Sequence, residues 1–230
     1  MGPRLSADER RVEILRAAER LFAEKGFHGA TTRDLADAAG VSEALIFKYF
    51  PTKERLYADM QAYACQHCED ERAHWKSLPP STTTLAILVH RLMTYTAQPP
   101  VELAEARTTG NRLMLHSLLS CGTFARLTLA ILSESVVDTL ARNVMAAAES
   151  GDCDAPPASL EDARLRAWTA VHAALMTKVS SLPERPVVDY GCDAGTLVRS
   201  MARFCLRGLG LSEAAIARTY QPDVLAVLES

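Results

Sequence analysis

Apolar residues recur at steps of three and four positions along most of this chain, and this periodicity is the feature that most restricts its fold. In the first segment, Leu15, Ala18 and Phe22 follow this spacing and fall on one face of a helix. Ala and Leu are abundant, runs of β-branched residues are scarce, and only 6% of the residues are aromatic. Because this composition favours helices over sheets, we predict an all-α protein.

Composition also limits the class of protein. The chain has 230 residues, of which 48% are hydrophobic and 23% are charged, with a formal net charge of −3. These values are typical of a soluble globular protein, and any DNA binding must be local. Residues 1–20 mix charged with apolar side chains, unlike a secretory signal, and no apolar stretch approaches the ~18 residues of a membrane span. We therefore expect a cytoplasmic protein with no membrane partner.

Glycine and proline residues divide the chain into predicted helices. Gly26 and Gly40 are expected to end the first two helices, and Pro51 ends the third. Further helices are predicted over 52–75, 82–97, 101–107, 112–120, 123–149, 160–179, 194–207 and 212–220. We interpret this pattern as a three-helix head, residues 1–57, followed by a larger helical body, residues 58–230.

The second and third predicted helices have the spacing of a helix-turn-helix. This motif needs a small residue where the helices cross, a turn residue that tolerates positive φ, and apolar anchors on the second helix. Ala36 meets the first need, Gly40 the second, and Val41 with Ile46 the third. The spacing alone also fits any two short helices joined by a glycine turn, so the flanking residues must decide.

The flanking residues resemble the DNA-binding head of TetR-family transcriptional regulators. The segments that carry the resemblance are residues 21–27 (LFAEKGF), 29–36 (GATTRDLA), 39–42 (AGVS) and 46–56 (IFKYFPTKERL). The likeness covers roughly residues 10–57, about a quarter of the chain. It implies a homodimer in which the third helix of each subunit enters the DNA major groove. It also implies a divergent helical body that binds a small effector and dimerises.

The resemblance assigns candidate DNA contacts residue by residue. They are Thr31, Thr32, Arg33, Ser42, Glu43, Ala44, Leu45, Lys48, Tyr49 and Lys53. Thr31, Thr32 and Arg33 open the second helix, where hydroxyls, backbone N–H groups and a cation suit phosphate. Thr31 with Asp34 could equally form a helix cap, close to a capping box, and the two roles are compatible. Tyr49 and Lys53 match positions that commonly contact phosphate in the family.

The third helix departs from the family pattern at its leading end. Glu43 and Leu45 stand where relatives often have a cation or glycine and a small hydroxyl residue. Glu43 can accept a hydrogen bond from cytosine N4, and Leu45 could pack on a thymine methyl group. The operator sequence therefore cannot be transferred from a relative. We assign Phe47 and Phe50 to the apolar core of the head.

The body contains no arrangement typical of an enzyme, such as a Gly-rich phosphate loop or an HExxH motif. It does place adaptable and polar side chains within apolar helices, and as a group these suggest a pocket for a hydrophobic, aromatic effector. The candidates are Met93, His116, Phe124, Trp168, His172 and Met176. Each could instead be an ordinary core residue. If the face of Trp168 and His172 looks inward, it offers stacking and a polar group.

The last two long helices resemble by position the pair that forms the dimer interface in this family. The apolar residues expected at that interface are Leu197, Met201, Phe204 and Cys205. Their spacing of i, i+4, i+7 and i+8 places them on one helix face. The same helices could instead close the core of a single subunit.

We therefore interpret the chain as a dimeric repressor that a hydrophobic small molecule releases from a palindromic operator, without enzymatic activity or cofactor. A second hypothesis is a redox or metal-sensing regulator that uses Cys65 and Cys68, and a third is an interaction protein that has lost DNA binding. We expect no metal at the cysteine pair, because the chain nearby offers no good further ligand. The acidic residues 69–71 also disfavour a thiolate.

Overall fold

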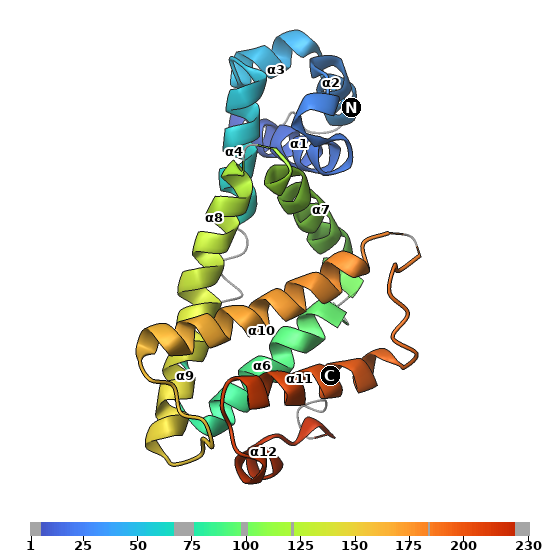
Figure 1. The fold of residues 1–230 in the computed structure, drawn as a ribbon. Helices are drawn as coiled ribbons and strands as arrows, with labels where there is room; N and C mark the ends of the chain where they lie inside the picture. Colours follow the sequence, from blue (N-terminus) through green and yellow to red (C-terminus); the bar gives the residue numbers. More distant parts are fainter. Residues whose placement is uncertain (1–5, 67–75, 98–100, 121, 184, 224–230) are drawn as a thin grey trace. The chain divides into compact units, whose positions relative to one another are not determined.

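The computed structural model describes residues 6–66, 76–97, 101–120, 122–183 and 185–223, without the side chains of 65–66 and 101–107. Within these ranges the regular elements are all helical and no strand is formed (Figure 1). The predicted all-α class is confirmed. None of the helices in the described ranges is long and apolar enough to cross a membrane.

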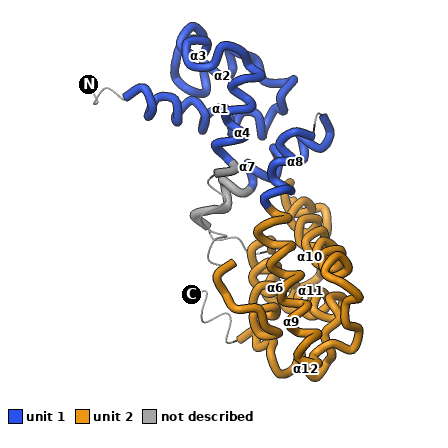
Figure 2. The backbone as a smooth tube through the Cα atoms, turned by 90° about the vertical axis from the view of Figure 1, so that its left-hand side faces the viewer, with its two compact units in different colours: residues 1–70, 104–131 blue, residues 71–103, 132–230 orange. Residues whose placement is uncertain are grey.

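The chain divides into two compact units, each built from separate stretches of sequence (Figure 2). Unit 1 contains residues 1–70 and 104–131, and unit 2 contains residues 71–103 and 132–230. The predicted division after residue 57 falls inside a helix of unit 1. It stays a prediction about which residues act on DNA and which on the effector.

Unit 1 combines the N-terminal helices with two later ones. Its helices are α1 (Ala7–Gly29), α2 (Thr32–Ala39), α3 (Glu43–Tyr49), α4 (Lys53–Gln66), most of α7 (Val101–Leu118) and α8 (Thr123–Leu132). A capping box starts α1, because Ser6 Oγ accepts from the backbone N–H of Glu9, whose side chain accepts from Ser6. Helix α1 continues to Gly29 across a kink at Gly26, where a helix end was expected.

The core of the N-terminal helices forms where α1 packs against α2 and α4. The ring of Tyr57 on α4 meets Phe22 edge-on at 4.9 Å and Phe27 at 5.0 Å between centroids. Ile46 of α3 and Phe50, which follows α3 directly, are also buried in this core, at 2% and 0% exposure. Truncating such a buried side chain to Ala typically costs about 2–5 kcal/mol, so these few residues hold the short helices in place.

Unit 2 is a helical bundle around α6. Its helices are α6 (Thr82–Ala97), α9 (Asp138–Glu149), α10 (Leu160–Ser180), α11 (Ala194–Gly208) and α12 (Glu213–Thr219). Helix α6 packs against α9, α10 and α11, and Leu85, Leu88 and Met93 are fully or almost fully buried. The single helix predicted over 123–149 is divided into α8, a π-helical turn (Ser133–Val137) and α9. The two helices predicted over 101–107 and 112–120 form the single α7.

Asp152 links three parts of unit 2 through hydrogen bonds. Its carboxylate accepts from Thr82 Oγ1 at 2.6 Å, at the start of α6, and from the guanidinium of Arg218 on α12 at 2.5 Å. The backbone carbonyl of Asp152 also accepts from Ser212 N. The Thr82 hydroxyl, then the Arg218 guanidinium, lower the pKa of Asp152 from its ordinary value. The loop after α9 is thereby held to both helices.

Candidate nucleic-acid interface

The turn between α2 and α3 has the geometry of a helix-turn-helix. Gly40 lies in the left-handed region at φ 62° and ψ 36°, and it ends α2. Val41 N donates to Ala36 O at 3.0 Å, which closes the turn. Ala36 is 3% exposed and Ile46 is 2% exposed. The small residue, the glycine and the Ile46 anchor therefore all serve the purposes predicted from their spacing.

The N-terminus of α2 carries the predicted capping box. Thr31 Oγ1 accepts from Asp34 N at 3.1 Å, and Asp34 Oδ2 accepts from Thr31 N at 2.9 Å. The Thr31 hydroxyl, then the Thr31 backbone N–H, then Lys25 lower the pKa of Asp34. Asp34 therefore supplies a negative charge where phosphate was predicted. Arg33 is exposed beside it, and contact of Thr31, Thr32 and Arg33 with phosphate stays a prediction.

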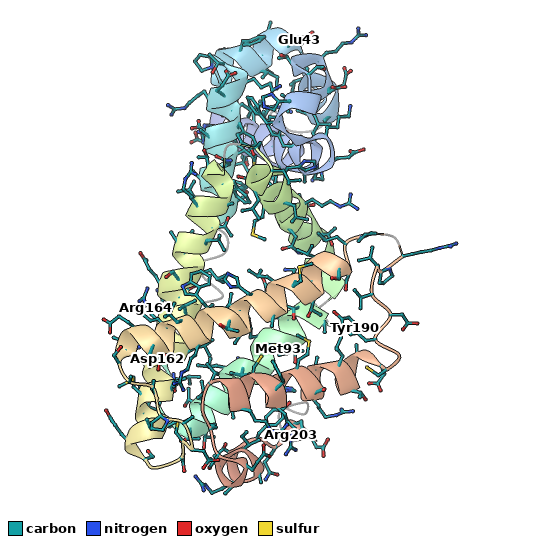
Figure 3. All side chains as sticks on the ribbon, viewed as in Figure 1. Glu43, Met93, Asp162, Arg164, Tyr190 and Arg203 are labelled. Carbon is teal, nitrogen blue, oxygen red and sulfur yellow. The ribbon has the colours of Figure 1, made fainter. Side chains whose placement is uncertain are left out.

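Helix α3 presents a contiguous exposed face. Ser42 Oγ accepts from Leu45 N at 3.2 Å and caps the helix. The exposed residues of α3 are Glu43, Ala44, Phe47 and Lys48, whereas Leu45 and Tyr49 are half-buried. Positions 43 and 47, like 44 and 48, are one helical turn apart, so the exposed residues are neighbours. Figure 3 labels Glu43 at the start of this face.

The assignment of Phe47 to the core is wrong, whereas that of Phe50 is confirmed. Phe47 is 46% exposed and Phe50 is 0% exposed. The buried face of this short helix is narrow, because Ile46 fills it and Phe50 follows one turn later. A ring at position 47 must then point away from α1 and α4. Sequence reasoning therefore missed Phe47 as a candidate DNA contact.

Lys53 is engaged inside unit 1. Its Nζ donates to Ala30 O at 2.7 Å and lies 4.5 Å from the centroid of the Phe27 ring. The ammonium thus joins the start of α4 to the connector before α2. An ammonium has three donors, so this bond leaves donors for the predicted phosphate contact.

Comparisons with known proteins agree with this geometry. Residues 14–60 match the family described as bacterial regulatory proteins, tetR family. This match covers 47 of the 230 residues, so the similarity to that family is shown for the N-terminal helices. It is 43% identical over 56 residues to the transcriptional activator FasR of Mycolicibacterium smegmatis, over 24% of this chain and 26% of FasR. It is 51% identical over 47 residues to the repressor AcnR of Corynebacterium efficiens, over 20% and 25% of the two chains.

The chain spans about a quarter of the length of these two curated relatives. Solved structures share the whole fold. A TetR-family protein from Rhodococcus RHA1 has a TM-score of 0.63 at 18% identity, covering 91% of this chain and 100% of that one. AibR, in complex with isovaleryl coenzyme A and operator DNA, has a TM-score of 0.61 at 16% identity, covering 85% and 97%.

Part of the α10 face that was predicted to line a pocket is exposed to solvent. His172 is exposed and stacks on Trp168 at 5.3 Å between ring centroids, and Met176 is 63% exposed. The inner face consists of small residues, among them Ala163, Ala167, Ala170 and Ala174. These let α10 approach α6 and α9 closely. Trp168 is half-buried and packs against the same core. His172 and Met176 therefore face away from the core of unit 2, and contact of Trp168, His172 and Met176 with an effector stays a prediction.

The other three predicted pocket residues belong to different units. Met93 is fully buried in the core of unit 2. His116 and Phe124 lie in unit 1, where Phe124 is 4% exposed and His116 is half-buried against Gly26. Their contact with an effector stays a prediction.

Sequence reasoning missed a set of buried polar side chains. Gln61 Nε2, Thr94 Oγ1, Asn111 Nδ2 and Thr128 Oγ1 are buried and have no hydrogen-bond partner among the protein atoms. Their signal in the sequence is a polar residue on the apolar side of a helix, which is weak because many such residues find partners. Only the three-dimensional structure separates the partnered from the unpartnered ones.

Of the interface residues predicted on α11, Phe204 is the most exposed. Phe204 is 71% exposed, while Leu197 and Met201 are half-buried. Cys205 is 5% exposed within its own core, so its assignment to the interface is wrong. Burial raises the pKa of the Cys205 thiol to about 11. Cys205 lies eight residues after Leu197, and at this spacing its side chain points into the core instead of toward the exposed face of α11.

The cysteine pair of the second hypothesis lies outside the described side chains. Cys65 belongs to α4, but its side chain and all of Cys68 are beyond what the structure describes. Among the described residues, no group of three or more His, Cys, Asp or Glu side chains is placed to hold a metal ion.

Proposed function

We propose that this protein is a dimeric, ligand-responsive DNA-binding transcriptional regulator that represses genes until a small organic effector releases it from a palindromic operator. The observation that carries the proposal is the exposed face of α3 on a capped helix-turn-helix. Its residues Glu43, Ala44, Phe47 and Lys48 offer an acceptor, an apolar ring and a cation to a groove. A helix held in this way can present side chains to base edges.

The similar proteins support both parts of the proposal. AibR is described in complex with an acyl coenzyme A and operator DNA. AcnR is described as a repressor and FasR as an activator. We propose repression for this chain.

We further propose that the outward face of α10 and Phe204 of α11 form the dimer interface. Leu165 is 67% exposed, Met176 is 63% exposed and Phe204 is 71% exposed. The exposed residues of α10 from Leu165 to Met176 include no Asp, Glu, Lys or Arg, with Thr169 and His172 between the two ends. Large apolar side chains concentrated on adjoining helices favour association over solvation. Trp168 and His172 then serve the interface rather than an effector pocket.

The deciding experiment selects the bound sequence from random duplex DNA and footprints the purified protein on it. We expect a twofold-symmetric site with half-sites about one helical turn apart or a multiple of it. Affinity should fall steeply with salt, because each dimer neutralises several phosphates. An asymmetric, unrepeated site bound by one chain would contradict the proposal.

The same operator separates the alternatives that the sequence leaves open. A response of DNA affinity to thiol reagents or chelators, but not to organic molecules, would favour sensing through Cys65 and Cys68. Failure to select any sequence would favour an interaction protein without DNA binding.

A further inference from the structure

The ring of His116 on α7 packs against α1 at Gly26, a residue that is itself buried. A Cβ placed on Gly26 would lie 3.0 Å from Nδ1, 3.4 Å from Cε1 and 3.5 Å from Cγ of His116. Figure 1 shows the C-terminal end of α7 beside α1. Because Gly26 has no side chain, one edge of the ring rests directly on the backbone of α1.

This contact falls on the kink of α1. Gly26 has φ 69° and ψ 173°, whereas the residues before and after it in α1 are helical. Glycine adopts positive and negative φ about equally readily, so its own preference does not decide whether α1 is kinked or straight. The groups packed around Gly26 must decide, and the ring of His116 is one of them.

The kink of α1 is tied to the start of α2 by three polar contacts. Ala30 N donates to Gly26 O at 3.3 Å, and Ala30 O accepts from Lys53 Nζ at 2.7 Å. On the other side of the kink, Lys25 Nζ pairs with Asp34 Oδ1 at 3.0 Å, and Asp34 caps α2. A change in the direction of α1 at Gly26 therefore alters the contacts that hold the first turn of α2.

Helix α2 in turn positions α3. The two helices pack on each other, and the hydrogen bond from Val41 N to Ala36 O closes the turn between them. They have only 8 and 7 residues, so they move as one unit and depend on their surroundings for orientation. The exposed face of α3 therefore follows the start of α2.

Helix α7 is continuous with the body of the protein. Its residues 101–103 belong to unit 2, and the rest of the helix, with His116, belongs to unit 1. A helix is a stiff element, so a shift or rotation imposed at its start reaches its end. The contact on Gly26 is thus placed where a change in α7 meets the DNA-binding helices.

We propose that His116 is a positioning residue for DNA binding, whose ring holds the kink of α1, and thereby α2 and α3, in the arrangement that fits the groove. This rests on the proposed function, because it names a contact through which the body regulates DNA binding. In this role His116 touches no DNA and acts through Gly26.

The test compares operator affinity with thermal stability in three variants of the full-length protein. His116→Ala removes the ring. His116→Asn keeps Cγ and puts a polar atom of similar size in place of Nδ1, the atom nearest to Gly26. Leu115→Ala is the matched control, because Leu115 is also half-buried on α7 and adjacent positions of a helix do not share a face.

We expect His116→Ala to weaken binding to the selected operator by at least about fivefold, the lower end of typical allosteric coupling. His116→Asn should bind the operator like the unmodified protein. Leu115→Ala should lower the melting temperature and leave operator affinity unchanged at temperatures where the variant is folded.

Hydrogen exchange follows the kink without DNA. The amide of Ala30, which bonds to Gly26 O, should exchange faster in His116→Ala than in the unmodified protein. The amide of Leu88, in the buried core of unit 2, should exchange at the same rate in both. His116→Asn should leave both amides unchanged.

Three results would overturn the inference. They are an unchanged operator affinity in His116→Ala, an equal loss of affinity in His116→Ala and His116→Asn, and an equal acceleration of exchange at Ala30 and Leu88. The last would mean that the ring only adds to overall stability. Failure of the unmodified protein to bind any selected DNA would contradict the proposed function itself, and exchange at Ala30 would still decide whether the ring holds the kink.

Discussion

The imidazole of His116 occupies the space that a side chain on Gly26 would need. A Cβ placed on Gly26 would lie 3.0 Å from His116 Nδ1. Gly26 is also at φ 69° and ψ 173°, a conformation that is open essentially to glycine alone. The kink in α1 and the approach of α7 therefore both depend on the missing side chain.

Replacing Gly26 should thus destabilise the protein through both strain and contact. We expect Gly26→Ala to cost about 2–3 kcal/mol in the free energy of unfolding, measured by denaturant titration. Gly40→Ala is the control, because Gly40 has φ 62° but no heavy atom within 4 Å of its added Cβ. It should cost only about 1–2 kcal/mol. If Gly26→Ala costs as much in a His116→Ala background, the contact contributes nothing.

The exposed ring of Phe47 is expected to read thymine methyl groups. Phe47→Ala should weaken binding to the selected operator by about 5- to 30-fold, and replacing the contacted thymine with deoxyuridine should cause a similar loss in the unmodified protein. In the variant, the base replacement should have no further effect. Leu45→Ala is the comparison, because Leu45 was predicted for the same role but is half-buried. Additive losses for Phe47→Ala and deoxyuridine would refute the contact.

Lys53 and Lys48 should differ in what their removal affects. Lys53→Ala should lower both stability, by about 1–2 kcal/mol, and affinity for all DNA sequences, because the ammonium holds Ala30 O. Lys48→Ala on the exposed face should lower affinity and reduce the salt slope by about 1 per contact, with stability unchanged. Unfolding curves and salt titrations on matched and mismatched operators measure both. If Lys48→Ala lowered the stability and Lys53→Ala did not, the roles assigned to the two lysines would be reversed.

Charge on the proposed dimer interface should separate the subunits. Phe204→Glu or Leu165→Glu places a carboxylate on the outward face of α11 or α10, and we expect monomers by light scattering and weaker operator binding. Leu119→Glu is the control, because Leu119 is 88% exposed in unit 1. If the dimer persists in both interface variants, the interface lies elsewhere.

The carboxylate of Asp152 should make stability depend on pH. Thr82 and then Arg218 lower its folded pKa, so its contribution is fully present above the unfolded value of about 3.9 and is lost as pH falls through the folded pKa. Asp152→Asn should therefore be less stable than the unmodified protein at pH 7, and the difference should shrink in acid. Asp154→Asn, exposed in the same loop, serves as the control in denaturant titrations across pH. A difference that does not change with pH would contradict the assignment.

The helix-turn-helix was predictable because its determinants are local. Ala36, Gly40 and Ile46 lie within one short segment and act through helix crossing, backbone conformation and a nearby core. The capping box of Thr31 and Asp34 is equally local. Such features depend on neighbours in the chain, so the sequence by itself determined them.

Side-chain direction on α3 and α10 was decided by tertiary structure. Phe47 and Phe50 are both aromatic, yet only the space left by α1 and α4 decides which one is buried. On α10, Ala163, Ala167 and Ala174 and the larger Met176 all look apolar in sequence, yet the three alanines are buried and Met176 is 63% exposed. Close packing against α6 and α9 favours small residues on the inner face, because a helix can approach its neighbours closely only where its side chains are short.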